Sequence, residues 1–234
     1  MLGNIAVGLA TSLVGGVLVW LWERGKRARV ANGKAAFFGV RPGETCLIVL
    51  GDKHDAPGTS PRSDVRATVE LAMLAAELGC DVELESGSYR GSNGGRTEFC
   101  VGGPLGGANL RTGGHLAAYL PGVTIHPYGT GPDSVALAVG GRRYLFDHDR
   151  QEYALVAKFT PTEAGRPVLL VCGQSSLANQ AAIHFLRREY AQAAALLESV
   201  TRFCLLLKVS DIGTYGYHRT AIERDVTREA FTRP

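Results

Sequence analysis

Residues 99–112 read FCVGGPLGGANLRT, and residues 169–182 read LLVCGQSSLANQAA. Each stretch passes from an apolar run through a turn containing glycine into a sequence with the character of a helix. Short apolar runs bounded by turn residues are typical of strands that are buried on both faces of a parallel sheet. Because the chain uses this strand–turn–helix unit twice, we predict an α/β, Rossmann-like fold with a mostly parallel sheet flanked by helices.

The same alternation continues on both sides of these stretches. The predicted strands are Thr45–Leu50, Asp81–Glu85, Glu98–Val101, Pro167–Cys172 and Phe203–Val209, and the predicted helices run from Ser63 or Asp64 to Leu78, from Asn109 to Leu120 and from Leu177 to Leu197. The first of these helices has one apolar face, formed by Val65, Val69, Ala72, Met73 and Ala76.

The middle of the chain has a different pattern. Ser134–Val139 and Arg142–Phe146 flank Gly140-Gly141, a two-residue signal for a β-hairpin. We expect Tyr153–Phe159 to be a third strand beside this hairpin. The sequence thus predicts a hairpin inserted into the Rossmann-like domain.

The N-terminal stretch Ile5–Trp22 reads IAVGLATSLVGGVLVWLW and contains no charged residue. A helix of this length spans about 27 Å, enough for the hydrocarbon core of a bilayer. Trp20 and Trp22 fall where interfacial aromatic residues belong, and four basic residues follow between 24 and 29. The positive-inside rule then places the rest of the chain in the cytoplasm. We expect an anchor with its basic flank at 1–30, a linker at 31–43 and a single domain at 44–234.

Two other interpretations of this stretch remain open, a secretory signal peptide and a buried helix. A signal peptide has its basic residues before the apolar region and a small-x-small cleavage site after it, and neither is present. Gly8, Ser12 and Gly16 share one face of the expected helix. Small residues at this spacing let two membrane helices approach closely, so this face is a candidate for self-association.

The composition excludes several classes of protein. The net charge of +3 is small, and several basic residues lie in the flank of the anchor, so charge indicates no nucleic-acid partner. The five cysteines show no CxxC spacing and lie in or beside apolar runs, which predicts buried reduced thiols and no zinc site. The alanine-, glycine- and arginine-rich usage suits a high-GC bacterium.

The glycine-rich turns predict a ligand site. Glycines allow the backbone to approach a ligand, and the start of a helix favours a phosphate or carboxylate. In open α/β sheets, ligands bind beyond the carboxyl ends of the strands. The candidate ligand-binding residues at that edge are Gly51, Asp52, Gly102, Gly103, Asn109, Gly173, Ser175 and Ser176. Neither G-x-G-x-x-G nor a P-loop is present, which disfavours ordinary dehydrogenases and P-loop ATPases, and the sequence identifies no cofactor.

The turn Gly102-Gly103-Pro104 before Asn109, followed later by Gly173-Gln174-Ser175-Ser176, resembles SLOG domains. These are Rossmann-like nucleotide-sensor domains of bacterial conflict systems. An N-terminal membrane helix on such a domain is similar to the sensors and effectors of those systems. The resemblance covers about a third of the chain and implies binding of a nucleotide or a nucleotide-derived signal.

Three side chains are candidates for catalysis: Glu85, Asp52 and His54. Glu85 ends its predicted strand, where an acid can bind a ribose hydroxyl or assist glycosidic cleavage. Asp52 and His54 form an acid–imidazole cluster that would gain a partner if it met Asp147-His148-Asp149 in space. Three functions therefore stay open: a membrane-anchored sensor, a hydrolase of an N-glycosidic or phosphoester bond, and a non-catalytic membrane scaffold.

Overall fold

The computed structural model describes residues 2–53, 56, 58–91 and 93–233, and within the first helix it describes side chains from residue 15 onward. The elements are α1 (Leu2–Phe38), β1 (Thr45–Leu50), α2 (Arg62–Glu77), β2 (Asp81–Ser86), β3 (Glu98–Val101), η1 (Leu105–Gly107), α3 (Leu110–Tyr119), β4 (Val123–Ile125), β5 (Leu137–Val139), β6 (Arg142–Tyr144), β7 (Gln151–Phe159), β8 (Val168–Gly173), α4 (Ser176–Leu196), β9 (Phe203–Ser210), α5 (Ile212–Tyr215), η2 (Gly216–His218), β10 (Thr220–Asp225) and α6 (Thr227–Ala230).

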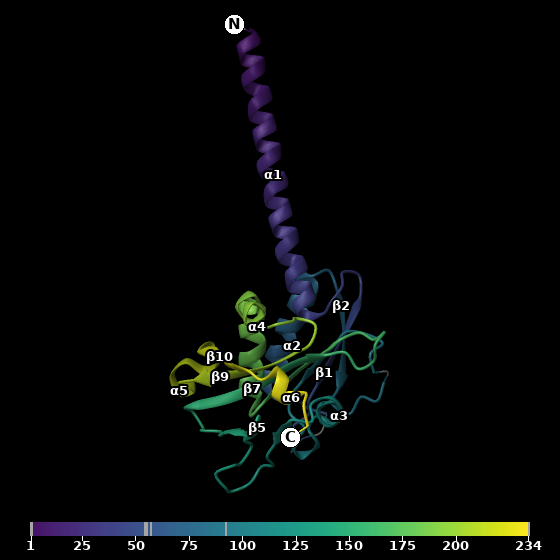
Figure 1. The fold of residues 1–234 in the computed structure, drawn as a ribbon, viewed down its shortest axis with the longest axis vertical. Coiled ribbons are helices and arrows are strands. Elements are labelled where there is room, and N and C mark those ends of the chain that lie inside the picture. The colour runs from purple at the N-terminus through teal and green to yellow at the C-terminus, as the bar shows by residue number, and fades with distance from the viewer. Residues whose placement is uncertain (1, 54–55, 57, 92, 234) are drawn as a thin grey trace.

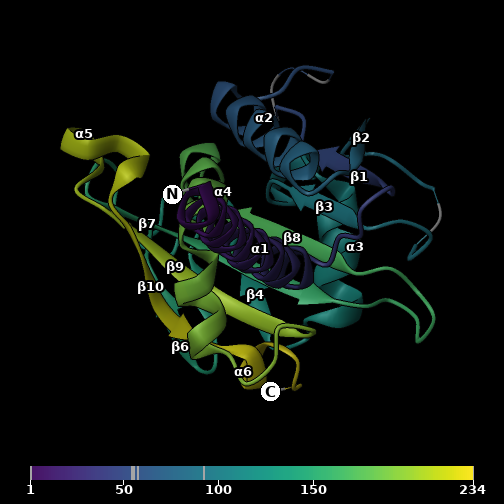
Figure 2. The same ribbon diagram turned by 90° about the horizontal axis from the view of Figure 1, so that it is seen from above.

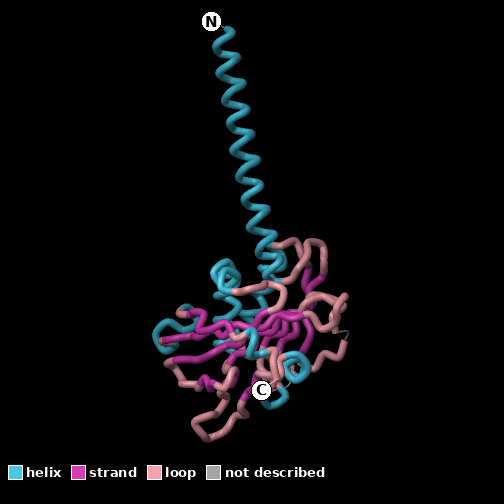
Figure 3. Tube along the Cα trace, in the orientation of Figure 1, coloured by secondary structure: helices cyan, strands magenta, loops and turns pink. Residues whose placement is uncertain are grey.

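Seven strands form the main sheet, in the order β10-β9-β7-β8-β3-β1-β2. Strands β8, β3, β1 and β2 pair in parallel, whereas β7 pairs antiparallel with β8 and β9, and β10 pairs antiparallel with β9. Five of the seven strands therefore run in one direction, which confirms the predicted α/β fold with a mostly parallel sheet. Figure 3 shows these strands as the central layer of the domain.

The predicted hairpin is confirmed, but its third strand is not the one expected. Strands β5 and β6 pair antiparallel across Gly140 and Gly141, whose φ angles of 59° and 71° suit a type I′ turn. Their partner is β4, in a separate three-stranded sheet. The prediction that Tyr153–Phe159 lies beside the hairpin is wrong, because β7 enters the main sheet between β8 and β9. This strand is buried from Glu152 to Phe159, so both of its faces need cover, and a central position supplies it.

Two apolar cores cover the two faces of the main sheet. The first packs α2, α4 and the end of α1 against β1, β3, β8 and β9. The second lies beneath α3, the small sheet and α6. Helices α2 and α3 thus lie on opposite faces, although they follow the neighbouring strands β1 and β3. All five cysteines are buried in these cores as free thiols, as predicted.

The predicted apolar face of α2 is not the face that packs. Val65, Val69 and Met73 are exposed, whereas α2 buries a different stripe that includes Leu71 and Leu74. The buried stripe also contains Ala67 and Ala75, whose small side chains let the helix approach the sheet closely. The helix carries apolar residues on two sides, and periodicity does not show which side meets the sheet.

Helix α1 projects from the domain (Figure 1), and Phe37 and Phe38 in its last turn belong to the first core. The base of α1 lies beside α4 (Figure 2). The Phe37 side chain is 0 % exposed and stacks on Phe203, with ring centroids 5.1 Å apart. The segment 31–43, expected to be a linker, thus forms the end of α1 and the turn into β1.

A buried lysine from β7 fixes this helix end. The Lys158 ammonium donates hydrogen bonds to the carbonyl oxygens of Ala36 (2.6 Å), Phe37 (3.0 Å) and Val200 (2.8 Å). A cation at a helix C-terminus satisfies carbonyls that have no partner within the helix and interacts favourably with the helix dipole. Burial lowers the pKa of Lys158 to about 8. The junction between helix and sheet is therefore a hydrogen-bonded, packed joint.

Among the described residues, no helix combines the length and the apolar character needed to cross a membrane. Part of the predicted anchor lies outside the described side chains, namely residues 5–14, which include Gly8 and Ser12. Every residue of α1 from Gly15 to Gly33 is exposed. Gly16, the third member of the predicted self-association face, has open space where a Cβ would stand.

Candidate functional site

A cavity of about 250 Å³ lies at the carboxyl ends of β1, β3 and β8. Strand β1 leads to α2 on one face of the sheet and β3 leads to α3 on the other, and such a divergence opens a crevice between the two strand ends. Seven of the eight residues predicted to bind a ligand line this cavity: Gly51, Asp52, Gly102, Gly103, Gly173, Ser175 and Ser176. The structure thus brings together three strand ends that are far apart in the sequence.

The glycines allow the strand ends to approach each other closely. Gly102 has a φ of 109°, and a Cβ on it would lie 3.5 Å from the Gly51 Cα. At Gly173 a Cβ would lie 2.8 Å from the Ala178 Cβ, too close for any side chain. These turns therefore require glycine to position the backbone around the cavity.

Asn109, the eighth predicted ligand residue, does not line the cavity. Its buried side chain caps α3, accepting a hydrogen bond from the Thr112 N–H (2.9 Å) and donating one to the Val101 carbonyl (3.0 Å). Both ends of the amide are thereby used inside the fold. The sequence pattern of an asparagine before a helix has a structural explanation here, as an N-cap.

Replacing Asn109 by alanine should therefore reduce stability and leave ligand affinity unchanged. Loss of an N-cap costs about 0.5–2 kcal/mol, and the Val101 carbonyl would also lose its donor. Urea unfolding of the full chain would measure the loss. A ligand affinity that fell while stability stayed the same would instead support a binding role for Asn109.

The cavity also contains an acid that the sequence did not single out for a role there. Asp64, in the first turn of α2, lines the cavity and is only 4 % exposed. The Asn179 side-chain amide donates a hydrogen bond to its Oδ1 (2.9 Å), and none of the described residues donates to its other oxygen. Burial raises the pKa of Asp64 to about 6. A carboxyl group with one unused oxygen thus faces the cavity.

A second buried acid lies directly behind the start of α4. The Ser175 hydroxyl donates a hydrogen bond to Glu152, and its oxygen accepts the N–H groups of Leu177 (3.1 Å) and Ala178 (3.2 Å). Burial raises the pKa of Glu152. The positive end of α4 is therefore met by the Ser175 cap, with the Glu152 carboxyl group behind it.

The small sheet covers part of the cavity. Ile125 and Val135 contribute apolar side chains to its lining. Gln174 holds this cover in place, because its amide donates to the carbonyls of Val135 (3.2 Å) and Tyr144 (2.7 Å) and accepts the Tyr153 N–H (2.8 Å). Val135 has a φ of 52°, which a β-branched residue rarely adopts. Such strain is found at ligand sites that the surrounding structure holds rigidly.

Of the candidate catalytic residues, the structure describes Asp52 and Glu85, and these two do not converge at the cavity. Asp52 lines the cavity, whereas Glu85, the last residue but one of β2, pairs with Val49 and is not part of the lining. His54 lies outside the described residues. His148 and Asp149 are exposed and do not line the cavity. Of the three candidates, the structure places only Asp52 at the cavity.

One group of buried side chains has the composition of a metal site. Ligand atoms of Glu98, Cys100 and His115 lie within 4.8 Å of one another. Both carboxylate oxygens of Glu98 are already used, by Arg111 (3.0 and 2.8 Å) and by the His115 ring (2.8 Å). Burial also raises the pKa of the Cys100 thiol, which keeps it protonated. A cation would have to displace Arg111, so we interpret this group as a structural ion-pair network.

Sequence reasoning missed Asp64, Asn179 and Glu152 as residues of the site. The sequence predicted Asp64 only as a possible start of a helix, whereas α2 begins at Arg62 and places Asp64 in its first turn. An acid in the first turn of the helix after β1 was the available signal. Comparison with known proteins gives no matching family model and no significantly similar curated protein.

Proposed function

We propose that this protein is a membrane-anchored sensor whose cytosolic domain binds a nucleotide or nucleotide-derived ligand at the ends of β1, β3 and β8. The proposal is carried by the cavity itself, which collects seven predicted ligand residues from three separate turns. Ligands of open α/β sheets bind at this position. The resemblance of the Gly102–Asn109 and Gly173–Ser176 turns to SLOG domains supports a nucleotide as the ligand class.

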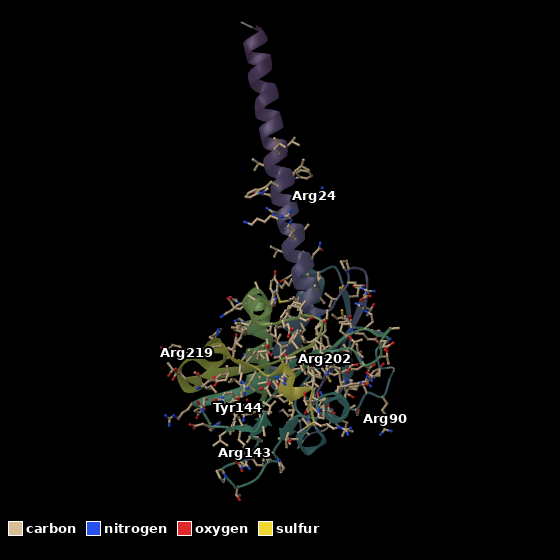
Figure 4. All side chains as sticks on the ribbon, viewed as in Figure 1. Arg24, Arg90, Arg143, Tyr144, Arg202 and Arg219 are labelled. Carbon is tan, nitrogen blue, oxygen red and sulfur yellow. The ribbon has the colours of Figure 1, made fainter. Side chains whose placement is uncertain are left out.

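The exposed part of α1 supports the anchor. Six consecutive large apolar side chains, from Val17 to Trp22, are between 48 and 69 % exposed on a helix that points away from the domain. Each such side chain gains about 1.5–3 kcal/mol when it leaves water, and a bilayer provides that environment. Arg24 follows on the same free helix (Figure 4), and its guanidinium lies over the Trp20 ring at 5.1 Å. Tryptophan beside arginine is typical of a cytoplasmic membrane interface.

The joint at Phe37 and Lys158 explains how a ligand would influence the anchor. Because the end of α1 is packed and hydrogen-bonded to the sheet, a rotation of the domain would be transmitted to the helix. One helix cannot form a pore, so any effect on the membrane requires association of several chains. Self-association through Gly8, Ser12 and Gly16 is part of this proposal.

The full chain in lipid nanodiscs tests the proposal. The five buried cysteines react with a thiol-specific fluorogenic dye only after unfolding, so the dye reports the melting temperature. We expect at least one compound from a panel of nucleosides, mono-, di- and cyclic nucleotides and NAD to raise that temperature and to be recovered intact. Consumption of the compound would favour a hydrolase, and no shift with any compound would favour the scaffold. A chain released from membranes by alkaline carbonate would contradict the anchor.

Two glycine-to-alanine variants, one at the cavity and one outside it, test the position of the ligand. In Gly103→Ala the new Cβ would lie 3.5 Å from the Cys172 Sγ, an ordinary contact, so the fold should persist while a bound ligand is crowded. Overpacking costs about 1–3 kcal/mol, which corresponds to a loss of affinity of about tenfold or more. Gly114→Ala, on α3 with open space around it, is the control and should leave affinity unchanged. Equal affinities in the two variants would place the ligand elsewhere.

A further inference from the structure

We infer that the cavity holds the pentose of the ligand, that Asp64 and Asp52 accept hydrogen bonds from its vicinal hydroxyls, and that any phosphate lies outside the cavity. This inference rests on the proposed function and specifies which part of the ligand the site binds. It differs from the expectation that glycine-rich turns and the start of α4 would hold a phosphate.

The size of the cavity limits what it can enclose. Pockets that bury drug-sized molecules measure about 300–1,000 Å³. A cavity of about 250 Å³ encloses one sugar with part of its substituents and leaves the rest of a nucleotide exposed. A dinucleotide would have to lie mostly outside.

The charges around the cavity disfavour a phosphate inside it. The described lining contains two acids, Asp52 and Asp64, and one cation, Lys53. Glu152 lies behind Ser175, and Asn179 holds Asp64 near the first turn of α4. A phosphate at this helix start would stand beside two carboxyl groups, and like charges at close range repel. Ser175 also already occupies the Leu177 and Ala178 N–H groups that would otherwise bind it.

The hydrogen bonding of Asp64 favours a ligand that donates from a hydroxyl group. One of its oxygens is held by Asn179, and none of the described residues donates to the other. The oxygen without a protein donor faces the cavity, where it can accept a hydrogen bond from a ligand hydroxyl. A fixed carboxylate that accepts from the hydroxyls of a ribose is an established way of recognising nucleosides in α/β folds. Here the acids come from the loop after β1 and from the first turn of α2.

The small sheet adds apolar residues to the lining that contains these acids. Ile125 and Val135 present apolar side chains to the same space, and Gln174 fixes Val135 by its hydrogen bond. A pentose has an apolar ring face opposite the edge that carries its hydroxyls. The cavity lining therefore contains both acceptors for the hydroxyls and apolar side chains for the C–H groups of a sugar.

Calorimetric titration of the full chain in a non-ionic detergent tests the inference. The probes are the four common ribonucleosides, their 5′-monophosphates and their 2′,3′-dideoxy forms. For the ribonucleoside that binds best, we expect removal of both hydroxyls to weaken binding at least about tenfold, because it removes the donors to the Asp64 and Asp52 carboxylates in the enclosed site. The monophosphate should bind within about threefold of the nucleoside. Millimolar inorganic phosphate should not compete.

Variants of the two acids test whether their carboxylates bind the ligand hydroxyls. Asp64→Asn should weaken ribonucleoside binding at least about tenfold and leave dideoxynucleoside binding unchanged, and Asp52→Asn should act in the same direction. Glu85→Gln, which changes an acid outside the cavity, is the control and should change neither. A thiol-dye melt of each variant shows that the fold persists.

Several results would overturn the inference. Equal binding of ribo- and dideoxynucleosides would show that the acids do not bind the hydroxyls. Competition by phosphate, or much tighter binding of the monophosphate, would show that the phosphate occupies the cavity. If 1,3-diaminopropane bound to the parent chain and this binding were lost in Asp64→Asn, the acids would be shown to bind an ammonium group. The proposed nucleotide sensor survives the results with dideoxynucleosides, phosphate and the monophosphate, whereas diamine binding at the acids, or absence of binding by every nucleoside and nucleotide, would overturn both.

Discussion

Replacing Phe37 by alanine should lower the free energy of unfolding by about 3–5 kcal/mol. Phe37 lies at the end of α1, yet it is fully buried, stacks on Phe203 and packs edge-on against Phe38. Alanine would leave a cavity between the helix and the sheet beside the ring it now covers. A loss of this size lowers the melting temperature of a domain this large by about 10 °C.

The thiol-dye melt of the full chain in nanodiscs measures this effect. Val30→Ala is the control, because Val30 lies two turns earlier on α1 and is exposed. It should change stability by less than about 0.5 kcal/mol. If the two variants had the same melting temperature, the end of α1 would not be a part of the domain core.

Replacing Asp64 by asparagine should raise stability at neutral pH. Asparagine has nearly the shape of aspartate and keeps an oxygen that can accept the Asn179 hydrogen bond. It also removes a carboxyl group that burial holds at a raised pKa of about 6. The gain should be about 1–3 kcal/mol at pH 7.5, because each unit of pKa shift corresponds to about 1.4 kcal/mol.

The pH dependence gives this prediction its sign. The folded pKa of Asp64 lies above the unfolded value of about 3.9, so the native state binds the proton more tightly. The carboxyl group therefore costs nothing below about pH 4, and its cost grows as pH rises through about 6. The difference in stability between Asp64→Asn and the parent chain should be close to zero at pH 4 and should reach its full size above pH 7.

Near-UV circular dichroism melts of both chains at pH 4, 5.5 and 7.5 would follow this difference. Other buried acids also have shifted pKa values, lowered at Glu98 by its partners His115 and Arg111 and raised at Glu152 by burial, and they contribute equally to both chains. A constant difference at all three pH values would mean that Asp64 titrates normally and that its burial carries no cost. An acid that lowers stability and faces a cavity is the pattern expected of a binding residue.

The local signals in this sequence were sufficient for most of the elements. Apolar runs such as Thr45–Leu50 and Glu98–Val101 predicted buried strands, and the glycines at 102, 103 and 173 predicted the turns that follow them. These signals are reliable because burial on both faces and a positive φ each restrict which residues fit. The rule that parallel strands end at one edge then correctly grouped seven of the eight predicted ligand residues at one cavity.

What the sequence by itself determined is therefore the class of the fold, the turns and the edge of the sheet where the cavity lies. Only the tertiary structure decided which side of α2 is buried, that β7 joins the main sheet, and that the end of α1 belongs to the core. It also decided that Asn109 caps a helix while Asp64 faces the cavity. Periodicity and turn chemistry act over a few residues, whereas burial depends on which element from elsewhere in the chain packs against a side chain.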